Sequence, residues 1–234
     1  MSTQLAAELL DVTKNKSITE QLTYLSNRFA DKIAFSTSFG YEDQLITHYI
    51  FTNNLPIKVF TLDTGRLFEE TYKTFSKTLD KYNREIIVYF PDKDKVENLV
   101  TKKGPNSFYQ SPENRKECCN IRKVIPLHEA LTGIDCWITG LRKDQSDARA
   151  GLDTFEWDAN FNLIKYSPLF SYTLQQVIDE INTFNVPYNV LHDKGFVSIG
   201  CAPCTRAIQP GEDFRAGRWW WEQNSKKECG LHAK

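Results

Sequence analysis

The sequence lacks the features that direct a chain to a membrane, to nucleic acid or to the secretory route. Its 29 Lys and Arg residues nearly balance its 30 Asp and Glu residues, and the formal net charge is −1. With so little net charge, the protein has no overall electric field that would attract nucleic acid or anionic lipid. Any anion-binding site must therefore be formed by a local cluster of residues. No run of about 18 apolar residues occurs, and we expect no membrane-spanning helix. The amino-terminal residues lack a basic region followed by a long apolar run, so we expect no signal peptide.

Cysteine is scarce but concentrated. Four of the six cysteines form two tight pairs, Cys118 with Cys119 and Cys201 with Cys204. Without a secretory signal, such pairs predict metal ligands or catalytic thiols rather than disulfides, and they favour a reducing, cytoplasmic location. Cys136 lies in an apolar segment and is predicted to be a small buried residue.

Apolar segments alternate with amphipathic ones along most of the chain. Strands are predicted at 32–36, 57–62, 85–90 and 135–139, with a hairpin at 155–166. Helices are predicted at 5–10, 17–29, 41–49, 67–75, 118–131 and 173–184, and a loop at 102–114. The alternation is typical of an α/β fold, a parallel twisted sheet flanked by helices. We expect one domain over 1–234, with a core to residue 210 and a mobile catalytic tail at 211–234.

Two polar turns follow neighbouring predicted strands. Ser36–Gly40 leads from a strand into a helix, so its hydroxyl and backbone N–H groups suit an anion. An ordinary turn with a serine cap explains the same residues. Asp63–Gly65 follows the next strand. Because the carboxyl ends of parallel strands meet at one sheet edge, the two turns together favour a nucleotide site.

Basic residues gather in two later segments. Arg142, Lys143 and Arg149 follow the strand at 135–139. Arg215 and Arg218 are three residues apart, a spacing that predicts one shared helix face. A solvated charged loop is the other interpretation of 142–149. Guanidinium groups bind phosphate or sulfate through paired hydrogen bonds, so we expect a small polyanionic substrate.

The spacing of Cys201 and Cys204 is typical of a hook that grips a metal. Adjacent side chains such as Cys118 and Cys119 diverge by roughly 100° on a helix, which suits two irons of a cluster better than one small ion. Spacing alone leaves a zinc site open. A redox disulfide between Cys201 and Cys204 is the weaker third interpretation.

Cys229 differs from the paired cysteines in its charged surroundings. It is preceded by Lys226 and Lys227 and followed by His232. Positive neighbours favour the thiolate, which is the nucleophilic form. The alternative is an incidental exposed thiol near the chain end. We predict that Cys229 performs the chemistry while the cysteine pairs hold a metal centre.

These segments together resemble the assimilatory sulfonucleotide reductases, specifically the iron–sulfur adenylyl-sulfate reductases. The most specific parts are residues 118–123, 200–206, 215–222 and 227–232. Residues 36–43 resemble the family's modified pyrophosphate (PP) loop, and 62–67 its adenosine-contacting turn. Related ATP pyrophosphatases carry Ser-Gly-Gly-x-Asp-Ser in that loop, whereas here Phe39 replaces a glycine and Asp43 the last serine. This departure removes anion-cradling groups and argues against ATP hydrolysis.

The resemblance implies an adenine nucleotide alpha hydrolase-like fold and a [4Fe-4S] cluster on Cys118, Cys119, Cys201 and Cys204. It implies reduction of adenylyl sulfate to sulfite and AMP by thioredoxin or glutaredoxin, in sulfate assimilation and cysteine biosynthesis. Cys229 is expected to carry an S-sulfonate, with Lys123 and His232 as further catalytic residues. The expected substrate-binding residues are Ser36, Ser38, Phe39, Gly40, Leu62, Asp63, Thr64, Gly140, Arg149, Arg215 and Arg218. We expect no nucleic-acid or membrane partner. The sequence is compatible with a homo-oligomer.

Three alternative functions involve another substrate or another class of protein. The 3′-phosphorylated nucleotide could replace adenylyl sulfate or be accepted beside it. A PP-loop tRNA-thiolating enzyme would need ATP, a Ser-Gly-Gly loop and a basic RNA-binding face, which the first loop and the net charge of −1 argue against. A non-enzymatic zinc or iron–sulfur module is the third.

Overall fold

Two compact units share the chain. The structure, a computed structural model, describes residues 2–145 and 153–222. The first unit comprises Met1–Thr61, Glu70–Ile87 and Gly133–Val190, and the second comprises Leu62–Glu69, Val88–Thr132 and Leu191–Lys234. Contacts between distant segments therefore hold each unit together. The expectations of a single domain and of a functional tail from residue 211 stay predictions.

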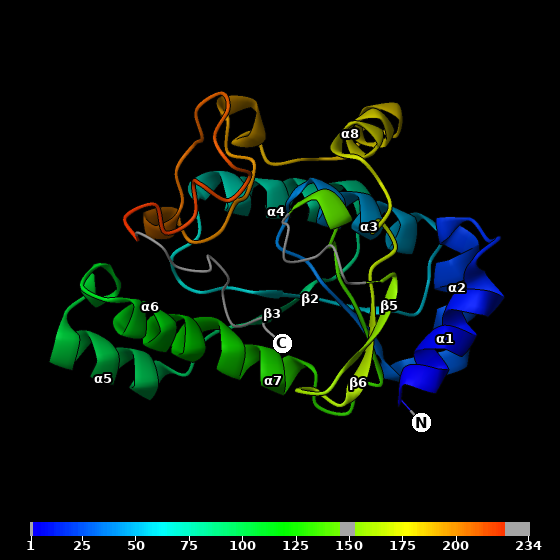
Figure 1. Cartoon of the computed structure of the whole chain (residues 1–234), viewed down its shortest axis with the longest axis horizontal. Helices are drawn as coiled ribbons and strands as arrows, with labels where there is room; N and C mark the ends of the chain where they lie inside the picture. The colour runs from blue at the N-terminus through cyan, green and yellow to red at the C-terminus, as the bar shows by residue number, and fades with distance from the viewer. Residues whose placement is uncertain (1, 146–152, 223–234) are drawn as a thin grey trace. The chain divides into compact units, whose positions relative to one another are not determined.

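Six strands form one sheet in the order β3-β2-β1-β4-β6-β5 (Figure 1). They are β1 (Ile33–Ser36), β2 (Lys58–Leu62), β3 (Ile87–Tyr89), β4 (Cys136–Ile138), β5 (Phe155–Asp158) and β6 (Leu163–Tyr166). β2, β1, β4 and β6 are parallel neighbours, and β5 pairs antiparallel with β6. Buried apolar residues fill β1 and β4, as expected for parallel strands covered on both faces. The predicted α/β class is confirmed.

The helices of the first unit begin at signals in the sequence. Before α2 (Ile18–Phe29), Ser17 N–H donates to Glu20 Oε2 at 2.7 Å, which completes a capping box. A second capping box starts α8 (Leu174–Thr183). The remaining helices are α1 (Ser2–Thr13), α3 (Tyr41–Thr52) and α4 (Glu69–Tyr82). α1 contacts β5 and β6, and α3 contacts α2 and α8.

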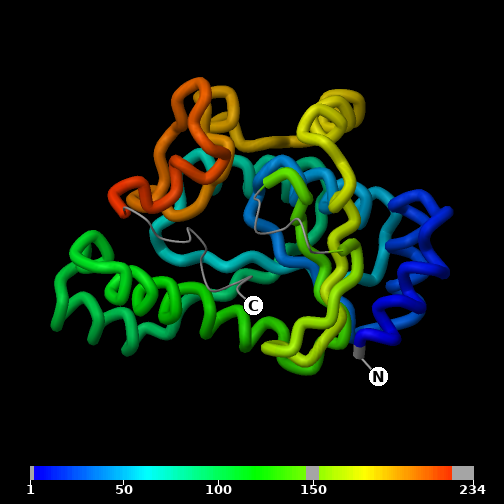
Figure 2. Tube along the Cα trace, viewed as in Figure 1, coloured from blue at the N-terminus to red at the C-terminus, as the bar shows by residue number. Residues whose placement is uncertain are grey.

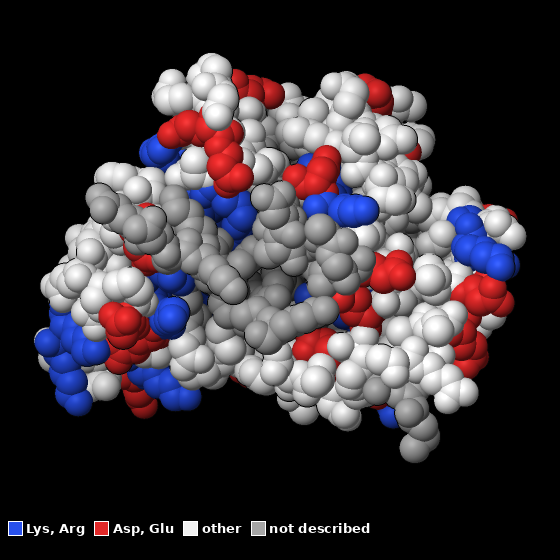
Figure 3. Space-filling view, viewed as in Figure 1, with Lys and Arg blue, Asp and Glu red and all other residues white. Residues whose placement is uncertain are grey.

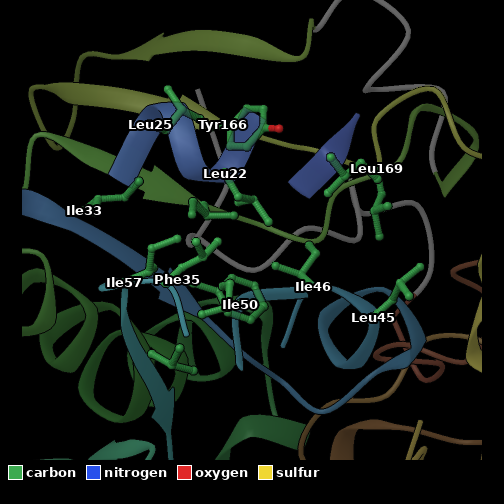
Figure 4. Close-up of a cluster of buried hydrophobic side chains, with 14 of the residues drawn as sticks. Leu22, Leu25, Ile33, Phe35, Leu45, Ile46, Ile50, Ile57, Tyr166 and Leu169 are labelled. Atoms are coloured by element: carbon green, nitrogen blue, oxygen red, sulfur yellow. The ribbon is translucent and has the colours of Figure 1, made fainter. Parts of the chain in front are cut away.

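The core of the first unit joins the sheet to these helices (Figure 4). The labelled side chains that are at most 1% exposed are Leu22, Leu25, Ile33, Phe35, Leu45, Ile46, Ile50, Tyr166 and Leu169. Each such burial stabilises the fold by about 1.5–3 kcal/mol. Cys136 is also fully buried here, as predicted. This packing fixes the ends of β1 and β4, where candidate binding residues lie.

The second unit contains α5 (Lys93–Lys103), α6 (Pro112–Cys119) and α7 (Ile125–Ala130). A π-helical turn, Asn120–Val124, continues α6 into α7. Lys103 Nζ donates to Glu117 Oε2 at 2.6 Å, and α5 and α6 lie side by side (Figure 2). After residue 190 the described chain forms short 3-10 turns, including Ala202–Cys204. Among the described residues, no helix has the length and apolar character needed to cross a membrane.

Two predictions for this unit need correction. The loop predicted at 102–114 is shorter: α5 ends at Lys103, α6 begins at Pro112, and the connection between them contains a 3-10 turn at Ser107–Tyr109. Ser111 caps α6 by accepting Asn114 N–H at 3.2 Å, and Pro112 occupies the first turn, where its missing N–H costs nothing. Cys118 and Cys119 therefore lie at the end of α6, rather than near the start of a helix.

Candidate functional site

The second unit contains a pocket lined by all four paired cysteines. Cys118 and Cys119 come from the last turn of α6, whereas Cys201 and Cys204 flank the turn at 201–204. Arg66, Phe108, Arg115, Arg122, Lys123 and Pro203 complete the lining. The structure thus brings together the two pairs that the sequence analysis selected. We call this feature the cysteine pocket.

Hydrogen bonds to the backbone shape the turn that carries Cys201 and Cys204. Cys204 N–H donates to the Cys201 carbonyl at 2.9 Å, and the Thr205 hydroxyl donates to the same carbonyl at 3.0 Å. Ala202 N–H donates to the Arg66 carbonyl at 2.8 Å, which ties the turn to a neighbouring segment. The two thiols are therefore presented by a defined backbone rather than by a free loop.

The π turn after α6 brings Arg122 to the pocket. Arg122 Nη1 donates to the Thr64 carbonyl at 2.7 Å, while Arg122 Nε is buried and has no hydrogen-bond partner among the described residues. Buried donors are rarely left unsatisfied in folded proteins, and π turns concentrate at functional sites. Arg122 Nε thus offers a donor to a group that fills the cysteine pocket.

The thiols differ in how readily they ionise. Burial alone would raise the pKa of Cys201, but the charge of Lys123, a hydrogen bond with Thr64 and the charge of Arg218 outweigh it and lower the pKa. Burial and the neighbouring Cys201 raise the pKa of Cys204 to about 12. The pocket therefore stabilises negative charge most strongly at Cys201.

The turn after β2, predicted to contact adenosine, touches the cysteine pocket. Asp63 Oδ1 accepts Gly65 N–H at 2.8 Å, and Gly65 adopts a φ of +70° that L side chains rarely adopt. Thr64 Oγ1 lies 3.3 Å from Cys201 Sγ. Leu62, which ends β2, is half-buried. Leu62, Asp63 and Thr64 therefore lie in the same unit as the cysteines.

Arg215 and Arg218 do not share a helix face, so that prediction is wrong. Residues 211–222 form turns, and Arg218 makes an isolated bridge with Thr205. A Cβ at position 217 would lie 2.3 Å from the Arg206 carbonyl, so Gly217 permits this close backbone approach. Each guanidinium instead contacts the ring of Trp219, with Arg215 at 5.9 Å and Arg218 at 4.9 Å from the ring centroid.

Arg218 is a buried cation beside the cysteine turn. A Cβ at position 200 would lie 2.3 Å from Arg218 Nη2, so only glycine leaves room for this guanidinium. Arg218 Nη1 donates to Ser198 Oγ at 3.3 Å, and Arg218 Nε is buried without a hydrogen-bond partner in the described part of the chain. Arg218 can therefore still donate to an anion.

A buried ion pair joins α6 to the segment before the carboxyl terminus. Arg115 Nε donates to Glu222 Oε1 at 2.7 Å, and Arg115 Nη2 donates to Glu222 Oε2 at 3.1 Å. The Arg115 guanidinium also stacks 4.5 Å from the Trp219 ring centroid. Trp219 is 1% exposed, whereas Trp220 is 49% exposed. Of these two tryptophans, only Trp219 therefore packs in the interior.

In the first unit, the loop after β1 adopts a tight conformation. Ser36 Oγ accepts Trp137 Nε1–H at 2.8 Å. Phe39 is buried with a φ of +62°, and its ring stacks on Phe75 at 4.8 Å. Gly40 is the residue before α3. The loop therefore contributes one of its own side chains, Phe39, to the buried interior.

The segment after β4 starts with Gly140 and continues to Arg142. Arg142 is 1% exposed, and its Nε donates to Glu42 Oε1 at 2.6 Å. Arg142 also pairs with Asp144. These carboxylates satisfy the charge of Arg142 within the first unit, so Arg142 is a structural cation rather than the free anion-binding group that its sequence position suggested.

Three predicted residues, Cys229, His232 and Arg149, lie outside the described residues. Five pocket residues were not selected from the sequence: Arg66, Phe108, Arg115, Arg122 and Pro203. Arg115 and Arg122 lie three or four positions from the cysteines, a helical spacing that could have indicated them. Arg66 and Phe108 meet through a cation–π contact of 5.1 Å that no local pattern reveals.

The chain is similar to known proteins over most of its length. The profile of the phosphoadenosine phosphosulfate reductase domain matches residues 32–207. The adenosine 5′-phosphosulfate reductase of Burkholderia cepacia is 48% identical over 202 residues, which cover 86% of this chain and 81% of that protein.

Two solved structures share the fold. The phosphoadenylyl-sulfate reductase of Candida auris, in a phosphate complex, has a TM-score of 0.75 and 25% identity, covering 89% of this chain and 98% of that one. The FMN adenylyltransferase of Candida glabrata has a TM-score of 0.53 and 15% identity, covering 99% and 83%. That second likeness supports the fold alone. From the profile match and the sequence identity, the chain belongs to the phosphoadenosine phosphosulfate reductase domain family, the sulfonucleotide reductases.

Proposed function

We propose that the protein reduces adenylyl sulfate to sulfite and AMP, using thioredoxin or glutaredoxin as the electron donor. One observation carries the proposal: a single pocket joins four cysteines, several basic side chains and the turn that begins at Leu62. The name of the Burkholderia cepacia relative, which is 48% identical, supports adenylyl sulfate as the substrate.

The cysteine pocket fits a [4Fe-4S] cluster held by Cys118, Cys119, Cys201 and Cys204. Such a cluster takes four thiolates. Within 2–145 and 153–222, no three His, Cys, Asp or Glu side chains converge as ligands of a single metal ion, although four thiols line this pocket. The basic lining suits a negatively charged group, and Arg122 Nε can donate to it. When bound, the cluster supplies compact negative charge that orders both cysteine segments.

In the first half of the reaction, we assign the nucleophile to the Cys229 thiolate. It attacks the sulfate sulfur, an S–S bond forms, and the S–O bond to the phosphate breaks. AMP leaves with the electron pair of that bond. Lys123, Arg149, Arg215 and Arg218 stabilise the developing charge. His232 and the lysines before Cys229 favour its thiolate form.

In the second half, a thiolate of reduced thioredoxin attacks Cys229 Sγ. Sulfite departs with the electron pair of the S–S bond, which leaves a mixed disulfide between the two proteins. The second thioredoxin thiol then displaces Cys229 as a thiolate. Two electrons thus pass from the dithiol to the sulfate sulfur. We place this reaction in the cytoplasm, in sulfate assimilation toward cysteine biosynthesis.

The alternatives fit the molecule less well. Figure 3 shows acidic and basic side chains interspersed over α5 and α6, whereas an RNA-binding face would be predominantly basic. The 3′-phosphorylated substrate remains the nearest alternative, since the Candida auris structure is of a phosphoadenylyl-sulfate reductase. Its identity of 25% is well below the 48% of the Burkholderia cepacia relative.

A comparison of the two sulfonucleotides tests the proposal. Anaerobically purified protein with reduced thioredoxin should release sulfite from at least one of the two nucleotides, adenylyl sulfate and 3′-phosphoadenylyl sulfate. We expect kcat/KM to favour adenylyl sulfate by at least about tenfold, which corresponds to about 1.4 kcal/mol. A preference for 3′-phosphoadenylyl sulfate would reassign the substrate. If neither nucleotide yields sulfite, the proposed reaction is overturned.

A further inference from the structure

We propose that Asp43 is an internal anion that occupies the phosphate cradle of the loop at 36–43 and so keeps nucleoside diphosphates and triphosphates out. The inference deepens the proposed function and rests on it for the identity of the accepted nucleotide. Asp43 would then be a specificity-determining residue, because it rejects ATP rather than binding adenylyl sulfate.

The Asp43 carboxylate takes the donors that a phosphate would need. Asp43 Oδ2 accepts the Ser38 N–H at 2.6 Å and the Ser38 hydroxyl at 2.7 Å. A backbone N–H and a hydroxyl just before a helix are groups that commonly bind phosphate. Phe39 N–H, the next donor in the loop, is already bound to Thr37 Oγ1 at 3.1 Å.

The second carboxylate oxygen is enclosed as well. A Cβ added at Gly140 would lie 2.1 Å from Asp43 Oδ1, so the carboxylate sits directly against the backbone that follows β4. Asp43 is only 8% exposed. The stacked ring of Phe39 on Phe75 occupies further space beside the loop. A diphosphate group could enter only by displacing the Asp43 carboxylate.

The charge of Asp43 opposes a second anion in the same place. Burial raises the pKa of Asp43, and its hydrogen bonds with Ser38 limit that rise, to about 6. The carboxylate is thus mainly ionised at neutral pH. Its neighbour Glu42 is neutralised by Arg142 at 2.6 Å, so Asp43 supplies the anion at this point of the loop. The loop is left to bind an uncharged part of a nucleotide.

Binding of inorganic pyrophosphate and of ATP tests the inference. Asp43→Ser frees the Ser38 donors and removes the charge, whereas Asp43→Asn removes the charge but keeps an oxygen that accepts the same hydrogen bonds. Asp158→Ser is the matched control, because Asp158 Oδ1 also accepts backbone N–H groups, from Asn160 at 3.0 Å and Phe161 at 3.3 Å, in a different turn. Calorimetric titration measures each variant, and circular dichroism verifies its fold.

We expect Asp43→Ser to bind pyrophosphate at least tenfold more tightly than the unmodified protein, with a smaller gain for Asp43→Asn and none for Asp158→Ser. Equal affinity in Asp43→Ser and Asp158→Ser would overturn the inference. If Asp43→Ser does not fold, Asp43→Asn decides: at least threefold tighter binding supports the role of Asp43, and unchanged binding refutes it. The titration uses no sulfonucleotide, so its failure is separate from a failure of the sulfite assay.

Discussion

Asp43 and Cys201 are both 8% exposed, yet their surroundings move their pKa values in opposite directions. Burial dominates at Asp43 and raises its pKa to about 6. At Cys201 burial also acts to raise the pKa, but Lys123, Thr64 and Arg218 together lower it. Nearby cations therefore favour the charged form of Cys201, whereas at Asp43 the hydrogen bonds with Ser38 only partly offset the effect of burial. The basic residues of the cysteine pocket suit it to an anionic cluster.

The raised pKa of Asp43 predicts a pH-dependent cost to stability. Since the folded-state pKa is about 6 and the ordinary value is 3.8, the folded state retains the proton longer than the unfolded chain. The free energy of unfolding should fall as the pH rises from about 4 to about 7, by at most about 3 kcal/mol from this group. Urea denaturation of the unmodified protein and of Asp43→Asn across this range measures the difference. A difference independent of pH would show that Asp43 titrates normally.

At the scale of single elements, α6 connects the cysteines to the chain before the carboxyl terminus through Arg115 and Glu222. Both side chains are at most 4% exposed. Removing one partner of a buried ion pair leaves the other charge uncompensated, at a cost of about 3–5 kcal/mol. We expect Glu222→Gln to lower the free energy of unfolding by that amount, as measured by urea denaturation.

The matched control lies on the same helix. Lys103 and Glu117 form an ion pair at 2.6 Å, but their side chains are 42% and 40% exposed. Exposed pairs contribute about 0–1 kcal/mol, so Glu117→Gln should change stability little. Equal effects of Glu222→Gln and Glu117→Gln would contradict the structural role assigned to the buried pair.

The cysteine pocket predicts a second element-scale result. Protein purified without oxygen should be brown, with broad absorbance at about 400 nm and iron bound to thiolates. Serine at any of Cys118, Cys119, Cys201 or Cys204 should remove that absorbance. Cys136→Ala, which changes a fully buried cysteine of the first unit, should keep it. Colourless protein that contains one zinc ion per chain would refute the iron–sulfur cluster.

Local signals in the sequence predicted the elements whose ends depend on neighbouring residues. Examples are the helix predicted at 17–29 and the parallel strands, because capping and apolar patterning act over a few residues. The segment holding Arg215 and Arg218 was predicted wrongly, because its turn depends on the bridge to Thr205. Such contacts join distant parts of the chain and leave no periodic pattern.

The same limit applied to the candidate site. The cysteine spacing selected all four thiols of the pocket. Arg66 and Phe108 were missed because only the folded chain brings them together. The ion pair between Arg142 and Glu42 could not be predicted from the sequence either, because the two residues are far apart along the chain. Chemistry-bearing residues were therefore easier to predict than the residues that surround or neutralise them.

At the scale of the whole molecule, the proposed reaction assigns different tasks to different parts of the chain. In this proposal, the cysteine pocket would bind an anionic cluster, and the arginines that contact Trp219 would offer positive charge to the substrate. The proposed nucleophile, Cys229, follows Glu222 by seven positions in the sequence. The proposed reaction therefore depends most on whether Cys229 attacks the nucleotide.

Mass spectrometry of the protein mixed with adenylyl sulfate, without thioredoxin, tests this claim most directly. We predict one AMP released per chain and a gain of about 80 Da on the peptide that contains Cys229, as expected for an S-sulfonate formed by nucleophilic attack. Reduced thioredoxin should remove the added mass and release sulfite. Cys229→Ser should keep the absorbance near about 400 nm but form no adduct. An adduct on another cysteine, or sulfite released at full rate by Cys229→Ser, would contradict the account.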